Sequence, residues 1–147
     1  MTARFDSFPR STRSVVLCAS IALYAVSLFL PAMYFERESP LPGVTLLAQG
    51  WFGLADLNPA WLANPFYAIA FVLGLRRRYG YASIFCGASI ACALYSPLTP
   101  KWYFSEAEGT PITGFGIAFY AWLAAQAVLL IGSLRLRRES ANPPANP

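Results

Sequence analysis

Residues 15–35 read VVLCASIALYAVSLFLPAMYF, and residues 114–134 read GFGIAFYAWLAAQAVLLIGSL. Each stretch has 21 residues and no charged side chain. Because an α-helix rises about 1.5 Å per residue, each stretch would extend roughly 30 Å, the thickness of the hydrocarbon core of a bilayer. The two stretches therefore predict two membrane-spanning helices.

Two less regular apolar segments lie between these stretches, one ending at Arg76-Arg77-Arg78 and the other just before Pro97. We expect an all-α membrane protein, a four-transmembrane-helix bundle over residues 14–135 with spans at about 15–35, 58–76, 80–96 and 114–134. A basic arm, residues 1–13, precedes the bundle, and a flexible tail rich in Pro and Asn, residues 136–147, follows it. A cleaved signal peptide is the alternative for the first span, but the apolar run is long for one and no small-x-small cleavage site follows it.

The composition supports a membrane protein. Of the 147 residues, 56% are hydrophobic and 12% are charged, whereas soluble domains have about 25% charged residues. The chain has too few charges to cover a water-facing surface and too many apolar residues to be disordered. It contains no histidine, which excludes a Ser-His catalytic pair and a histidine-ligated haem or diiron centre.

Basic residues gather on one side of the predicted membrane. Four spans place nine arginines and two acids on the side of both termini, and Arg37 and Lys101 with five acids on the other. The positive-inside rule then predicts that both termini are cytoplasmic. Because the arginines are spread over three sites that flank apolar helices, we expect contact with the lipid bilayer and not with nucleic acid.

The second span contains an irregular place at Asn64-Pro65. If Asn64 caps a helix that begins at Pro65, the helix ends after only about 20 Å. Either the helix begins earlier, so that the Trp61 carbonyl lacks its usual donor, or the preceding segment, residues 44–57, lies in the outer leaflet. We expect residues 44–57 to form an ordered outer loop that is partly interfacial or re-entrant and packs against protein.

The sequence Gly50-Trp51, followed by Ala-Trp-Leu-Ala-Asn-Pro at residues 60–65, resembles small four-span inner-membrane proteins of bacteria. The resemblance implies a multi-pass protein of the bacterial inner, or cytoplasmic, membrane. It implies no activity.

The third span is rich in small residues, and Ser83, Gly87 and Ala91 recur every four residues on one face. This small-xxx-small pattern lets helices pack closely in lipid. We expect the face to pack within the chain, with a homodimer as the alternative.

Few groups in this chain are suited to catalysis. Cys18, Cys86 and Cys92 are single residues inside predicted spans, which are not the outer cysteine pairs of thiol oxidoreductases. No charged side chain lies deep in a span, which departs from the small four-helix multidrug exporters that are similar in size and carry an intramembrane glutamate. We therefore expect no enzyme, no cofactor and no metal site.

We expect the chain to act by binding a membrane or periplasmic protein, as an immunity-type protein or an accessory subunit does. The candidate partner-binding residues lie in the outer loops: Glu36, Glu38, Asp56, Glu106, Glu108 and Trp102. The alternative is a small channel, carrier or lipid-handling protein with a cleft between the second span and the outer loop, reaching Trp61, Asn64, Pro65 and Gln126. The outer aromatic residues Trp51, Trp61, Trp102 and Tyr103 form either an interfacial belt or the walls of that cleft.

Overall fold

The computed structural model describes residues 8–104 and 109–142, and the fold is mostly helical with one small sheet. The α-helices are α1 (Phe8–Phe29), α2 (Gly43–Gln49), α3 (Ala63–Leu75), α4 (Tyr79–Ala93) and α5 (Ile117–Ala141). Short 3-10 helices are η1 (Gly50–Asp56), η2 (Pro59–Leu62) and η3 (Ser96–Leu98). The strands are β1 (Pro31–Phe35), β2 (Leu41–Pro42), β3 (Lys101–Tyr103) and β4 (Gly109–Phe115).

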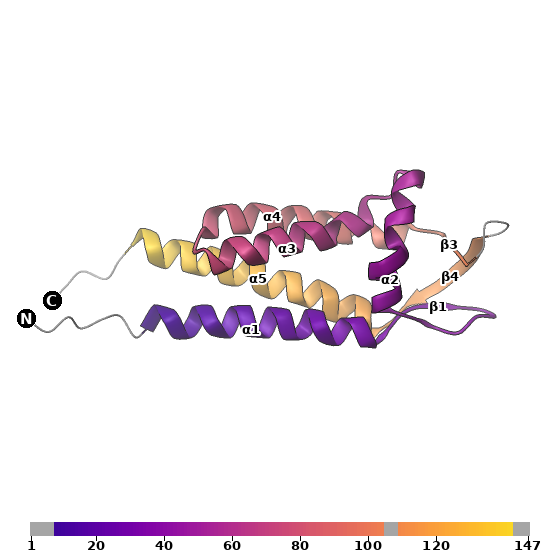
Figure 1. The fold of residues 1–147 in the computed structure, drawn as a ribbon, viewed down its shortest axis with the longest axis horizontal. Helices are drawn as coiled ribbons and strands as arrows, with labels where there is room; N and C mark the ends of the chain where they lie inside the picture. The colour runs from indigo at the N-terminus through magenta and orange to yellow at the C-terminus, as the bar shows by residue number, and fades with distance from the viewer. Residues whose placement is uncertain (1–7, 105–108, 143–147) are drawn as a thin grey trace, which may run out of the picture.

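Four helices, α1, α3, α4 and α5, run side by side along the length of the molecule (Figure 1). Their most extensive contacts join α1 to α5, α5 to α4, and α4 to α3. Three described stretches are long and apolar enough to cross a membrane, namely Thr12–Phe29, Tyr79–Leu98 and Ile117–Ala141. The stretch Pro59–Leu75 is apolar but shorter.

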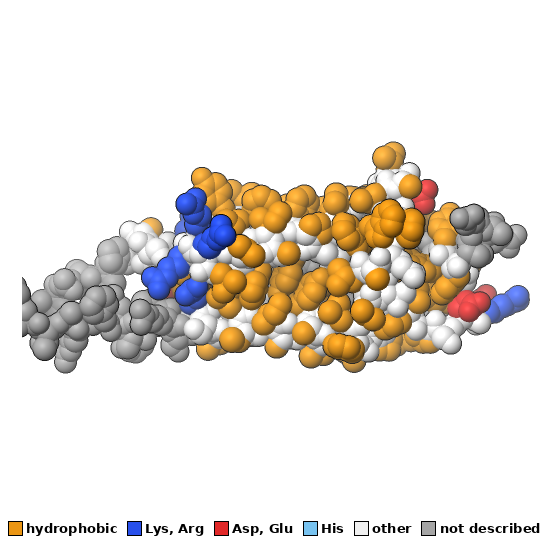
Figure 2. All heavy atoms as spheres, viewed as in Figure 1, with side chains coloured by type: hydrophobic (Ala, Val, Ile, Leu, Met, Phe, Trp, Pro, Cys, Tyr) orange, Lys and Arg blue, Asp and Glu red, His pale blue; other side chains and the backbone are white. Residues whose placement is uncertain are grey.

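Charges are separated along the bundle. Most Lys and Arg side chains gather at the end where α1 begins and α5 ends, whereas acidic side chains, with basic atoms beside them, appear at the opposite end (Figure 2). The apolar surface between the two ends is continuous in this view. We call these two ends the basic end and the acidic end.

The sheet at the acidic end was not predicted. Its strand order is β2-β1-β4-β3, and each neighbouring pair is antiparallel. Residues 31–35 and 114–115 belong to β1 and β4, so the predicted boundaries of the first and fourth spans are wrong there. Pro31 lacks an amide hydrogen and cannot continue α1, and β1 pairs Met33 with Phe115.

The termini of the bundle also differ from the prediction. Helix α1 begins at Phe8, inside the predicted arm, and α5 continues to Ala141, inside the predicted flexible tail. The expected ordered outer loop is found as α2 and η1, and α2 lies across the acidic end of the bundle (Figure 1). Its first residue, Gly43, donates its N–H to the carbonyl of Leu30 at 3.1 Å, which fixes α2 to the end of α1.

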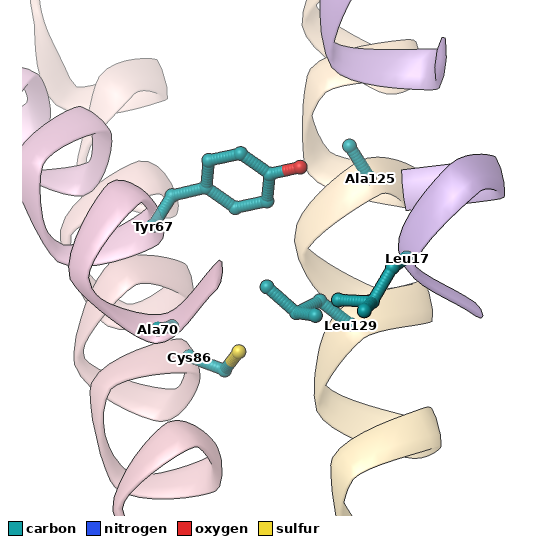
Figure 3. Packing of buried hydrophobic residues seen from close by; sticks show 6 residues of the cluster. All are labelled: Leu17, Tyr67, Ala70, Cys86, Ala125 and Leu129. Carbon is teal, nitrogen blue, oxygen red and sulfur yellow. The ribbon is translucent and has the colours of Figure 1, made fainter. Parts of the chain in front are cut away.

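The centre of the bundle is built from small residues and a few large ones. Leu17, Tyr67, Ala70, Cys86, Ala125 and Leu129 form the buried cluster, and they come from all four long helices. Figure 3 shows Tyr67 pointing from α3 across the interior toward α5. Its hydroxyl lies 2.8 Å from Ser20 Oγ, and Ser20 also donates to the carbonyl of Ala125 at 2.8 Å. Polar contacts therefore join α3, α1 and α5 inside an apolar core.

The small face predicted on α4 is not the face that packs within the chain. Ser83 is buried and donates to the Gly80 carbonyl of its own helix, but Gly87 and Ala91 are exposed. The buried residues of α4 are Ala82, Ser83, Cys86, Ser89 and Ala93. Because the residues of this buried face are as small as those of the predicted face, residue size alone does not show which face of α4 packs within the chain. The homodimer through the exposed face stays a prediction.

A close approach between two long helices occurs instead at Gly132 of α5. A Cβ atom at this position would overlap the side chain of Val16 on α1, whereas a Cβ at Gly87 would meet no heavy atom of the described residues within 4 Å. Alanine favours a helix over glycine by about 0.5–1 kcal/mol, but overpacking costs about 1–3 kcal/mol.

We expect Gly132→Ala to lower the free energy of unfolding by about 1–2 kcal/mol, because the added methyl group separates α1 from α5. Gly87→Ala is the matched control and should leave stability unchanged or slightly raised. Thermal unfolding in detergent, followed by circular dichroism, measures both. Equal behaviour of the two variants would contradict this packing.

Candidate functional site

A cavity of about 920 Å³ lies at the acidic end of the bundle. It is enclosed by the ends of α1 and α5, by α2, η1 and η2, and by the chain from Tyr95 through β3. Most of its lining is apolar, with the aromatic residues Tyr24, Phe52, Trp61, Tyr95, Trp102, Tyr103, Phe104, Phe115, Phe119 and Trp122. Ligand sites in proteins commonly have volumes of about 300–1,000 Å³ and mostly apolar walls, so this cavity is the candidate site.

Asn64 forms the floor of the cavity. Its Oδ1 accepts hydrogen bonds from the Tyr24 hydroxyl at 2.9 Å and from Trp122 Nε1 at 3.0 Å. Its Nδ2 donates to the Trp61 carbonyl at 3.2 Å. One side chain thus connects α3 to α1, α5 and η2, and we call these four residues the Asn64 clamp.

The clamp resolves the irregularity at Pro65. Pro65 has no N–H to donate to the carbonyl of Trp61, four residues before it. That carbonyl instead accepts from Asn64 Nδ2, and the Ala63 N–H also points to it. The helical path therefore begins at Pro59 in η2 and continues through Pro65 into α3, and Asn64 lies within the first turn of α3 and does not cap it.

The wall formed by η2 is fixed by two further side chains. Asn58 caps η2 by accepting from the Ala60 N–H at 3.0 Å, and its Nδ2 donates to Thr99 Oγ1 at 2.6 Å. Trp61 Nε1 donates to the Leu47 carbonyl of α2 at 2.9 Å. These bonds hold η2 against α2 on one side and against the segment after α4 on the other.

The mouth of the cavity has apolar and charged residues side by side in the lining. Phe52, Leu98 and Tyr103 are more than half exposed. Asp56 and Lys101 are the charged residues among the described lining, and both are exposed. An apolar interior with a mouth of mixed polarity suits a ligand that is itself amphipathic.

The cavity does not reach the middle of the bundle. Gln126 is fully buried and is not part of the lining, so the expectation of a cleft reaching Gln126 is wrong. Ser89 Oγ lies 2.7 Å from both the Ala63 carbonyl and Gln126 Oε1, but a hydroxyl has one hydrogen to donate. Gln126 Nε2 has no partner among the described residues; with the amide turned over, it would donate to Ser89 Oγ while Ser89 donates to Ala63.

The structure places some of the other candidate partner-binding and cleft residues in the cavity lining and others outside it. Trp61, Asn64, Trp102 and Asp56 line the cavity, and Pro65 is half-buried beside it. Glu36 and Glu38 are exposed between β1 and β2, while Glu106 and Glu108 lie outside the described residues. Glu36 and Glu38 therefore lie on one segment and Asp56 on another, so the described acids among the predicted residues do not form one acidic surface.

Sequence reasoning missed Tyr24, Trp122 and Asn58. Asn58 could have been noticed in the sequence, because it also precedes a proline: the pair Asn58-Pro59 occurs six residues before the pair Asn64-Pro65. Tyr24 and Trp122 lie within apolar runs whose periodicity does not mark them. Over residues 8–104 and 109–142, no group of three or more His, Cys, Asp or Glu side chains could hold a metal ion.

Comparisons with known proteins give no match: no family model, no curated protein and no solved structure is significantly similar to this chain.

We expect Asn64→Ala to lower the free energy of unfolding by about 2–4 kcal/mol, because three hydrogen-bonding partners lose the amide and all three are partly buried. Trp122→Phe removes a single donor from the clamp and should cost about 1 kcal/mol. Chemical unfolding in mixed micelles provides the comparison. A loss for Asn64→Ala no larger than that for Trp122→Phe would show that the clamp does not hold the site together.

Proposed function

We propose that this chain is a four-span membrane protein that binds the apolar part of a lipid, or of a similar elongated amphiphile, in the cavity at its acidic end. The proposed role is binding or transfer without catalysis. The observation that carries the proposal is a cavity of about 920 Å³ with aromatic walls and an exposed mouth at which apolar and charged side chains meet.

The length of the shorter apolar stretch, Pro59–Leu75, supports four spans. The 13 residues of α3 and the 4 of η2 extend about 27 Å together at the usual rises of α and 3-10 helices. That length is close to the roughly 30 Å of a hydrocarbon core. The clamp supports this reading, because it lets the helical path continue through Pro65.

Charge supports an orientation with the basic end in the cytoplasm. The described arginines of the turn after α3 and of the last turns of α5 are gathered at the basic end (Figure 2). Glu36, Glu38 and Asp56 belong to segments at the acidic end. By the positive-inside rule the cavity then opens on the outer side, and a bacterial inner membrane remains the proposed location.

The surface beside the cavity mouth suits the outer membrane interface. Trp51 and Phe52 of η1 stack with ring centroids 3.9 Å apart, and they are 48% and 62% exposed. Exposed indole rings such as that of Trp51 partition to the interface, so η1 would be held at the level where lipid headgroups meet acyl chains. A ligand could then enter the cavity laterally from the outer leaflet.

Binding of a membrane or periplasmic protein is a second candidate function. It is favoured by the sheet, because β3 is an edge strand, and Tyr103 at its end and Phe104 directly after it are 58% and 44% exposed. Edge strands can pair with an added strand of another protein. Site-specific photo-crosslinking from Tyr103 in native membranes tests this role, and crosslinks to lipid alone would contradict it.

The lipid proposal can be tested by tryptophan fluorescence. The chain has 4 tryptophans, and in a Trp51→Phe variant the remaining three all line the cavity. We expect saturable quenching of this variant by a phosphatidylcholine with brominated acyl chains in mixed micelles, because bromine quenches at short range.

Ala118, 2% exposed and part of the lining, provides the blocking variant. Ala118→Phe should weaken the quenching at least five-fold, and Ala60→Leu, at a half-buried lining position, is a milder second variant. Ala68→Phe, on the exposed side of α3, is the control and should leave quenching unchanged. Equal quenching in all variants would overturn the proposal.

A further inference from the structure

A second hollow, of about 380 Å³, is lined by residues of the basic end of the molecule. The turn between α3 and α4 forms one side of it, and the last turns of α5 form the other. Its lining includes the arginines Arg77, Arg78 and Arg137 and the tyrosines Tyr79 and Tyr81. We call it the arginine hollow.

Backbone geometry places the first two arginines. The Arg77 N–H donates to the Gly74 carbonyl at 3.1 Å, and the Arg78 N–H donates to the Leu73 carbonyl at 2.9 Å. This pair of bonds is the Schellman ending of a helix, which needs a left-handed residue, and Arg77 has φ 58°. The two arginines are thus fixed in the tight turn where α3 ends and α4 begins.

The third arginine arrives from a distant part of the sequence. A Cβ atom at Gly80 would lie 3.9 Å from Arg137 Nε. The Arg137 side chain therefore lies beside the first turn of α4. Three positive charges from two elements face one hollow.

These three guanidinium groups have no hydrogen-bond or ion-pair partner within the described part of the chain, and no acidic residue lines the hollow. Arg13 nearby behaves differently, because it donates to the Leu75 carbonyl at the end of α3. Like charges held together repel each other. An anion in the hollow would relieve this repulsion, and the planar guanidinium fork fits phosphate oxygens in particular.

The surroundings of the arginine hollow favour a lipid as the source of the phosphate. Tyr81 is 60% exposed and Ile84, one turn further along α4, is 65% exposed. Tyrosine rings prefer the membrane interface, and the exposed apolar side of α4 continues from there along the bundle. A headgroup in the hollow would leave its acyl chains along this face.

We propose that the arginine hollow binds the phosphate of an anionic phospholipid headgroup. The inference rests on the proposed placement in a membrane, but it does not depend on what the outer cavity binds. Each arginine of the hollow should contribute about five-fold to the affinity, the effect typical of one net hydrogen bond to the bound headgroup.

Binding of single phosphatidylglycerol molecules to the full chain in neutral detergent, counted by native mass spectrometry, tests this proposal. The test variant is Arg77→Gln, Arg78→Gln and Arg137→Gln together, and Arg137→Gln alone is the milder form. The control is Arg76→Gln, Arg135→Gln and Arg138→Gln together, which removes the same charge from exposed residues outside the hollow.

We expect about a 100-fold loss of affinity for the triple test variant, about five-fold for Arg137→Gln, and less than two-fold for the control. Phosphatidylcholine should bind weakly to every form. Equal losses in the test and control triple variants would overturn the proposal, because net charge alone would then explain binding. Displacement of the lipid by glycerol 3-phosphate at equal concentration would also overturn it, since the ligand would then be a soluble phosphate ester. The quenching assay at the outer cavity is unaffected by either outcome, so failure of the two proposals can be told apart.

Discussion

The structure depends on how the chain accommodates a proline in the first turn of α3. Pro65 withdraws one backbone donor, and the Asn64 side chain replaces it at the Trp61 carbonyl while its oxygen binds Tyr24 and Trp122. The same amide therefore extends the helical path back to Pro59, ties three helices together and lines the cavity at the acidic end. Helix continuity and the candidate site are two results of one set of hydrogen bonds.

The two halves of the bundle are built on different principles. Toward the basic end, the Val16 side chain lies directly over Gly132, and α1 and α5 approach closely. Toward the acidic end, the rings of Tyr24 on α1 and Tyr67 on α3 stack with their centroids 4.7 Å apart. Beyond this pair lies the cavity. In the membrane placement that we propose, helices associate through close packing and hydrogen bonds because the surroundings are as apolar as the core. A tight basic half can then support a hollow acidic half.

Hydropathy identified the helical stretches because each contains an apolar run free of charge, and the arginine positions predicted which ends lie together. The sheet escaped prediction because residues 31–35 and 114–115 are apolar continuations of helical runs, and only Pro31 and the glycines at 114 and 116 interrupt them. On α4 the small residues occupy both faces, so the spacing of Ser83, Gly87 and Ala91 could not show which face is buried. The sequence identified Asn64-Pro65 as irregular, but the partners of Asn64 are 40 and 58 residues away along the chain. Hydropathy and residue spacing describe neighbours along the chain, so they cannot predict contacts between residues so far apart in the sequence.

Hydrogen exchange of the indole N–H groups, followed by NMR in micelles, tests the clamp most directly. Trp61 Nε1 and Trp122 Nε1 both donate hydrogen bonds, the first to Leu47 and the second to Asn64. The account predicts slow exchange for both in the natural chain. In an Asn64→Leu variant, Trp122 should exchange much faster while Trp61 stays protected. If Trp122 exchange does not respond to the loss of Asn64, the clamp is not what holds α3 to α5, and the central claim is wrong.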